Sequence, residues 1–86
     1  MNRIDIMIDA ANAVDIALAG TGLDDAQAKV RDRHNALSEF DRGAVEGIAA
    51  GILADGRVEE GVYTRDGVYF ALVKAFDVHL MSFDGE

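Results

Sequence analysis

The sequence contains neither cysteine nor proline. Without cysteine the chain can form no disulfide, zinc–thiolate site or cysteine nucleophile, and its composition allows a reducing compartment. A chain of this length has about four prolines at average usage, and without them no helix is interrupted by a proline ring. These absences exclude a disulfide scaffold and permit long, uninterrupted helices.

Long apolar runs are missing as well. Asp5 and Asp9 interrupt the apolar N-terminal stretch, which is therefore not expected to be a signal peptide, and there is no run of about 20 apolar residues that would span a bilayer. Half of the 86 residues are nevertheless hydrophobic, which favours a folded core over disorder. We therefore expect one cytoplasmic domain over residues 1–86, because two half-length domains could not each bury a workable core.

Basic residues are scarce. The chain has 8 lysines and arginines against 16 aspartates and glutamates, a formal net charge of −8. Repulsion from phosphate makes direct nucleic-acid binding unfavourable, whereas the same charge suits a protein partner with a basic surface. One basic cluster stands out, formed by Lys29, Arg31, Arg33 and His34. Its position near the end of a predicted helix complements the helix dipole, and a contact with nucleic acid is the alternative interpretation.

Apolar residues recur at helical spacing along the chain. The pattern predicts a mainly α fold, a compact bundle of about four helices. Asp24, Ser38 and Asp66 are suitable N-caps for the second, third and fourth helices, and Gly20, Gly22 and Gly56 are suited to end the first and third. The predicted helices cover residues 2–19, 25–37, 39–54 and 68–83.

The first two predicted helices differ in how much apolar surface they carry. The first has a continuous apolar face, which is expected to point into the core. The second has the thinnest apolar set and is expected to be the most solvated helix. The apolar face of the first helix consists of Ile4, Met7, Ile8, Ala11, Val14 and Leu18.

The third predicted helix is apolar on most sides, which is typical of a central helix. It also carries Gly43, Gly47 and Gly51, spaced four residues apart so that they form one stripe. Each glycine destabilises a helix interior by about 1 kcal/mol relative to alanine, so the stripe needs a reason. Two interpretations explain it: another helix of the same chain packs closely against the glycines, or they form the seam of a homodimer.

The segment before the fourth predicted helix is ambiguous. Residues 57–65 fit a short strand, a helical turn or a loop. Asp66-Gly67 is suited to a hairpin turn between the apolar stretches on either side of it. An α+β fold with a C-terminal hairpin or small sheet is therefore the alternative to a fourth helix.

Exposed apolar side chains are the best candidates for contact with a partner. Three such residues project away from the main apolar arc of the fourth predicted helix. Acidic side chains on the outer face of the first helix and in the segment after the third would add electrostatic attraction. The predicted contact residues are Phe70, Val78, Met81, Asp5, Asp9, Glu59 and Glu60.

No arrangement of residues predicts catalysis. His34 and His79 are the only histidines, and neither has the neighbours of a metal site at ligand spacing. No serine lies in a G-x-S-x-G turn. His79 falls within the apolar arc of the fourth helix, where a hydrogen-bonded, partly buried side chain is expected. We therefore predict no catalytic residue, no metal and no cofactor, and a protein that is not an enzyme.

In general composition the chain resembles the small accessory proteins of bacteria and their phages, many of which inhibit or redirect a host complex by occupying its surface. The resemblance implies a non-enzymatic protein-binding module whose acidic surface occupies a basic one. Two alternatives remain. One is a self-associating structural subunit that dimerises through the glycine stripe. The other is a regulator associated with transcription or nucleic acid that uses residues 29–34.

Overall fold

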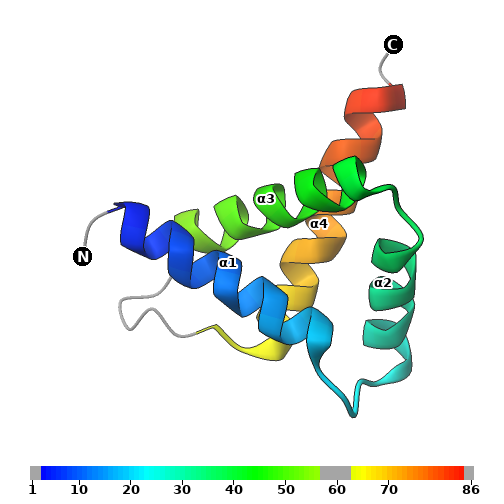
Figure 1. Ribbon diagram of the computed structural model, residues 1–86, viewed down its shortest axis with the longest axis horizontal. Coiled ribbons are helices and arrows are strands. Elements are labelled where there is room, and N and C mark those ends of the chain that lie inside the picture. Colours follow the sequence, from blue (N-terminus) through cyan, green and yellow to red (C-terminus); the bar gives the residue numbers. More distant parts are fainter. Residues whose placement is uncertain (1–2, 57–62, 85–86) are drawn as a thin grey trace.

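The computed structural model of the protein describes residues 3–56 and 63–84, with the side chains of the last helix described as far as His79. Within these residues the chain forms four α-helices and no strand (Figure 1). The predicted mainly α bundle is confirmed. The alternative hairpin at Asp66-Gly67 is wrong, because both residues lie in the first turn of the last helix. The helices are α1 (Arg3–Ala19), α2 (Asp25–Asn35), α3 (Glu39–Asp55) and α4 (Arg65–Asp84).

The predicted N-caps of α2 and α3 are confirmed. Asp24 accepts a hydrogen bond from the backbone N–H of Gln27 at 2.7 Å, and the Gln27 side chain accepts one from the backbone N–H of Asp24. This reciprocal capping box satisfies two backbone donors at the start of α2. Ser38 accepts a hydrogen bond from the backbone N–H of Asp41 at 3.1 Å and so caps α3.

α4 begins before the position that apolar periodicity predicts, and the predicted cap Asp66 is wrong because it lies inside the first turn of the helix. Thr64, the residue before the helix, accepts a hydrogen bond from the backbone N–H of Gly67 at 3.1 Å. A side-chain oxygen at this place satisfies a donor that has no partner within the helix, so the helix starts at Arg65. α1 ends at Ala19, and Gly22 turns the chain toward α2 with a left-handed φ of 71°.

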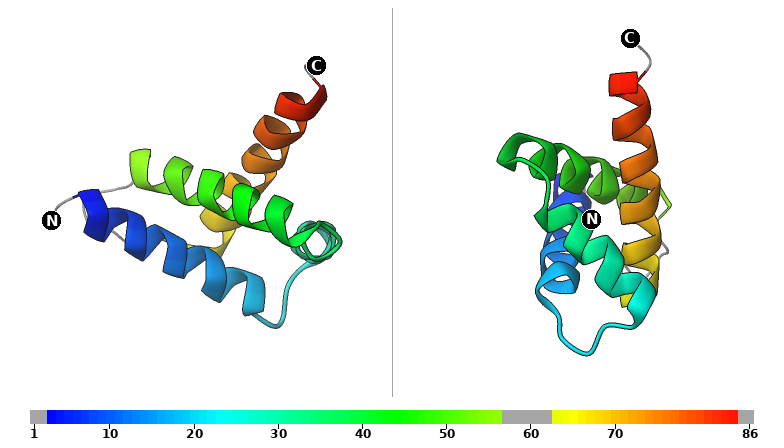
Figure 2. Two further views of the ribbon diagram at one scale, coloured as in Figure 1. Left: turned by 45° about the horizontal axis from the view of Figure 1, so that its top comes forward. Right: turned by 90° about the vertical axis from the view of Figure 1, so that its right-hand side faces the viewer.

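α3 is the central helix, as predicted, because it packs against both α1 and α4. α1 and α3 run in roughly opposite directions, with the start of α1 beside the end of α3, and α4 crosses behind them (Figures 1 and 2). α2 spans the distance between the end of α1 and the start of α3. No helix in the described part of the chain is long and apolar enough to cross a membrane.

The main core lies where α1, α3 and α4 meet. Tyr69 of α4 is buried there and donates its hydroxyl to the Ala17 carbonyl of α1 at 2.9 Å, and its burial raises the pKa of the phenol. A smaller cluster of Ala10, Ala50 and Ala54 joins α1 to α3. Small side chains at a contact allow two helix axes to approach closely. Among the described residues, the largest fully buried side chains are Leu72, Val14, Val45 and Val68.

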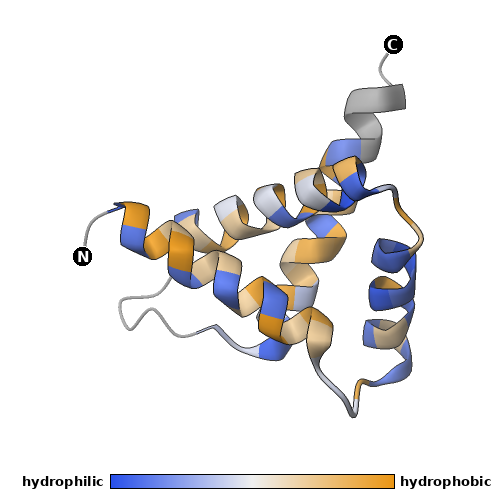
Figure 3. Ribbon diagram, in the orientation of Figure 1, coloured by the Kyte–Doolittle hydropathy of each residue, from blue (hydrophilic) through white to orange (hydrophobic). Residues whose placement is uncertain are grey.

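α2 is the most polar helix, as its sequence predicts (Figure 3). Its buried residues are Gln27 and His34. Gln27 donates a hydrogen bond to Asp66 of α4 at 2.6 Å, and the guanidinium carbon of Arg33 lies 4.6 Å from the centroid of the Phe76 ring. Polar and cation–π contacts therefore help to attach α2 to α4.

Candidate functional site

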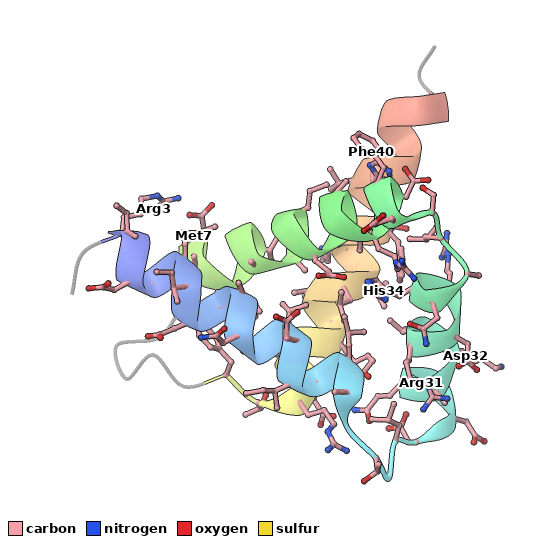
Figure 4. The ribbon with its side chains drawn as sticks, viewed as in Figure 1. Arg3, Met7, Arg31, Asp32, His34 and Phe40 are labelled. Atoms are coloured by element: carbon pink, nitrogen blue, oxygen red, sulfur yellow. The ribbon has the colours of Figure 1, made fainter. Side chains whose placement is uncertain are left out.

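An open groove of about 610 Å³ lies between α1 and α3. Its walls are mainly apolar, with charged side chains at both ends. Because the two helices run in opposite directions, the start of α1 and the end of α3 form one end of the groove; Arg3 and Met7 mark this part of α1 in Figure 4. The apolar walls include Ile4, Met7 and Ile8 of α1, and Gly43, Gly47 and Ala50 of α3.

The α1 wall contains large residues that the sequence predicts to face the core. Ile4 is 71% exposed and Ile8 is 52% exposed, so this prediction is wrong for these two residues, whereas Met7 is partly buried against the core. α1 instead buries Ala10, Val14 and Ala17, because it meets α3 over alanines and only small side chains permit that close contact. Two large apolar side chains are thereby left in an open groove, which is typical of an interaction surface.

Two of the three glycines of the stripe, Gly43 and Gly47, line the α3 wall, whereas Gly51 does not. A Cβ atom built at Gly43, Gly47 or Gly51 meets no described atom within 4 Å. Among the described residues, then, no helix of this chain packs closely against the stripe. α1 meets α3 on one side of the stripe, over Ala50, and α4 meets it on the other side, near Val45. The other interpretation, a homodimer seam, stays a prediction.

Two carboxylates, Asp15 of α1 and Glu46 of α3, line one end of the groove. Asp15 is exposed and forms no hydrogen bond or ion pair within the described chain. Glu46 accepts a hydrogen bond at 2.7 Å from Nε2 of His34, a buried side chain that points from α2 toward α3 (Figure 4). This contact orients Glu46 while 34% of its side chain stays exposed. At the opposite end Arg3 donates to Asp55 at 2.9 Å.

Phe70 and Val78, two of the apolar contact residues predicted on α4, do not line this groove. Phe70 is 63% exposed and Val78 is 47% exposed. Phe70 lies beside Val73 in a smaller hollow between α2 and α4, and the Lys74 ammonium is 5.3 Å from the centroid of its ring. Val78 does not line that hollow. The side chain of Met81 lies outside the described residues, so its predicted contact is not placed.

Of the acidic contact residues predicted from the sequence, the structure places only Asp5 and Asp9. Asp5 and Asp9 are exposed on α1, but neither lines the groove. Glu59 and Glu60 lie outside the described residues. The carboxylates at the end of the groove are different ones, which the sequence pattern does not single out.

The basic segment of α2 does not form one continuous basic surface. Arg31 pairs with the neighbouring Asp32 at 3.0 Å (Figure 4). Arg33 lies over an aromatic ring of α4, and His34 is buried against α3. Lys29 is exposed. The cluster is therefore largely engaged in contacts within the chain.

His79 is buried and hydrogen-bonded, as its position in the apolar arc predicts. Its Nε2 atom lies 3.0 Å from Oδ1 of Asp41 on α3, and this hydrogen bond lowers the pKa of Asp41. His34 makes the equivalent contact from α2 to Glu46, so each buried histidine joins another helix to a carboxylate of α3. Among the described residues no group of three or more histidines and carboxylates could hold a metal ion.

Comparison of the chain with protein-family models, with curated proteins and with solved structures gives no match. Sequence periodicity does not identify Ile4 and Ile8 as surface residues, because they share a helical face with the buried Val14. The stability cost of the glycine stripe is the signal in the sequence that points to an open surface on α3.

Proposed function

We propose that the protein is a non-enzymatic protein-binding module that holds a helix of another protein in the groove between α1 and α3. In this recurring mode of recognition, an amphipathic helix lays its apolar face into an apolar groove. The observation that carries the proposal is the combination of exposed isoleucines on α1 with glycines on α3 that have open space beside them.

The dimensions of the groove suit a helix. From Ile4 to Asp15 the α1 wall rises about 16 Å, or about three helical turns. Ile4, Ile8 and Ala11 follow the i, i+4, i+7 spacing of one helix face. Opposite them, Gly43 and Gly47 leave room for the partner's side chains to reach the backbone of α3.

The energetics of the glycine stripe also support a partner. Three glycines in a helix interior cost roughly 3 kcal/mol relative to alanines, a large fraction of the 5–15 kcal/mol or so that stabilises a typical domain. Since no described atom lies within 4 Å of the space that alanine methyls at Gly43, Gly47 and Gly51 would occupy, this cost is not offset by packing within the chain. A molecule bound in the groove would account for the two of these glycines that line it, Gly43 and Gly47.

A helix-binding groove fits the class of small accessory proteins that the composition resembles. On this proposal the protein inhibits or redirects a host complex by occupying a basic surface, for which its net charge of −8 is suited. The second candidate function is a homodimer formed through the same groove. The open glycine stripe favours it, because small residues allow two helices to approach closely.

The proposal is tested by photo-crosslinking from two matched positions on α1. Ile4 is 71% exposed in the groove, and Ile16 is 73% exposed outside it. A photo-reactive amino acid placed at Ile4 is expected to capture a specific protein from the cell, and the same group at Ile16 is expected not to capture it. Gly47→Leu, which fills the groove, should abolish the capture from Ile4.

Two results would contradict the proposal. Equal capture from Ile4 and Ile16 would indicate binding that does not depend on the groove. Undiminished capture by a correctly folded Gly47→Leu variant would place the contact elsewhere. Circular dichroism of each variant provides the check on folding, and no loss of helix content is expected because position 47 has open space beside it.

A further inference from the structure

We infer that the occupant of the groove is a cationic amphipathic helix, with a lysine or arginine that reaches Asp15 and Glu46 at one end. This inference rests on the proposed function and specifies the chemistry of its partner. It follows from the distribution of charge along the groove, where the middle is apolar and one end carries two carboxylates.

The fold brings these two carboxylates to the same end. Asp15 lies in the second half of α1 and Glu46 in the first half of α3. Because the helices run in roughly opposite directions, these halves lie opposite each other (Figure 1). Arg3 is the cation that lines the groove, but it belongs to the start of α1 at the other end and is already bonded to Asp55 at 2.9 Å.

Both carboxylates have capacity for further hydrogen bonds. Asp15 has no hydrogen-bond or ion-pair partner in the described chain. Glu46 uses one oxygen toward His34 at 2.7 Å, while an ionised carboxylate offers two oxygens and about four acceptor sites. Each can therefore receive a donor from outside without giving up a contact within the fold.

A helix that covers the groove needs a cation beside the two carboxylates. A helix that lies over the isoleucines displaces water from this end of the groove, and burying a carboxylate without a donor is strongly unfavourable. A lysine or arginine on the occupant replaces the lost water with a charge-assisted hydrogen bond. The net charge of −8 adds a long-range attraction for the same kind of partner.

A second copy of the chain is less suited to the groove than such a helix. It would bring another net charge of −8 and a further pair of carboxylates. The cation in the groove of that second copy would be its Arg3, which already donates a hydrogen bond to Asp55. Charge complementarity therefore favours a different, basic partner.

The inference is tested with three synthetic helical peptides of about 18 residues. They share one face of leucine and alanine, and they carry lysine, glutamine or glutamate at positions beyond one end of that face. Fluorescence anisotropy with the purified protein should show that the lysine peptide binds about tenfold or more tightly than the glutamine peptide at low salt. The advantage should shrink at high salt, because the charges become screened.

Two aspartates of α1 provide matched variants. Asp15→Asn should remove most of the preference for lysine, whereas Asp9→Asn, an exposed position outside the groove, should leave it unchanged. Equal binding of all three peptides, blocked by Gly47→Leu, would overturn the inference while leaving the groove as a helix-binding site.

Other outcomes separate the inference from the proposed function. If no peptide binds and no protein is captured from Ile4, both are overturned. If no peptide binds but capture from Ile4 succeeds, the groove binds protein and the cationic helix is overturned as its occupant. A dimer seen by light scattering that becomes a monomer in Gly47→Leu would identify the second copy as the occupant, and it would likewise overturn the inference.

Discussion

Toward α4, α3 presents Val45 and Ala49, whose side chains are completely buried in a cluster with Leu72 of α4. Toward the groove the same helix presents Gly43 and Gly47, which are exposed and have open space where a side chain would be. Small residues therefore have two uses in one helix. Alanine lets helices of the chain meet closely, whereas glycine keeps a surface open. This difference supports the proposal that the groove side of α3 binds another molecule.

The largest expected difference in stability comes from truncating one large side chain at the α3–α4 contact and one in the groove. Leu72→Ala should lower the free energy of unfolding by about 2–5 kcal/mol, because Leu72 is fully buried and the deletion leaves a cavity. Ile4→Ala should change it by no more than about 0.5 kcal/mol, since that side chain is 71% exposed. Urea unfolding followed by circular dichroism measures both. Equal losses would mean that Ile4 packs against the fold and that the groove is not open.

Enlarging a residue of α3 at the α4 contact and another in the groove should give a somewhat smaller difference in stability. Ala49→Leu should destabilise the protein by about 1–3 kcal/mol, because the closed contact has no room for extra carbons. Gly47→Leu should cause no loss of stability, since nothing lies within 4 Å of its Cβ position. The same denaturation measurement compares the two variants. A loss at position 47 as large as that at position 49 would show that the glycine stripe is covered within the chain.

Adding a single methyl group to the glycine stripe should change the stability by a smaller amount. Gly47→Ala should raise the free energy of unfolding by up to about 1 kcal/mol, because alanine is the better helix former and its methyl meets open space. Gly22→Ala is the control and should destabilise the protein, since Gly22 has a φ of 71° that alanine adopts with strain. If binding of the lysine peptide falls while stability rises in Gly47→Ala, the glycine serves the partner rather than the fold.

The smallest expected effect is a pH dependence of stability that arises from Asp41, at the contact between α3 and α4. The hydrogen bond from His79 lowers the pKa of Asp41 below 3.8, so ionised Asp41 stabilises the folded state above that pH. This contribution is lost as the pH falls through the lowered pKa. The urea midpoint of the wild type should therefore drop more steeply below pH 3.8 than that of Asp41→Asn. Parallel curves for the two proteins would contradict a role for this carboxylate in acid sensitivity.

Helix positions and helix starts are largely predictable from the sequence, because they depend on neighbouring residues. Asp24 and Ser38 cap α2 and α3 as expected, since a side-chain oxygen and the first backbone donors are close along the chain. The start of α4 is less predictable. Thr64 caps it, and apolar periodicity says nothing about a turn that lies before the first apolar residue of the pattern.

The candidate site is predictable only in part. The glycine stripe is visible in the sequence, and its cost in helix stability indicates that it has a function. The role of Ile4 and Ile8 is not visible, because helical spacing places them on the same face as Val14 without stating which edge of that face meets a neighbour. The groove carboxylates are also hidden, since Asp15 and Glu46 are more than thirty positions apart along the chain.

The sequence by itself determined a small acidic protein of four helices, with a polar second helix and a glycine stripe on the third. These properties follow from composition and local hydrogen bonding, which act between residues near each other in the chain. Tertiary structure decided that the stripe is open. It also decided that two isoleucines face it and that two carboxylates lie at one end. The reason is that α1 approaches α3 through alanines rather than through its largest side chains, and that choice depends on how the helices fit together in space.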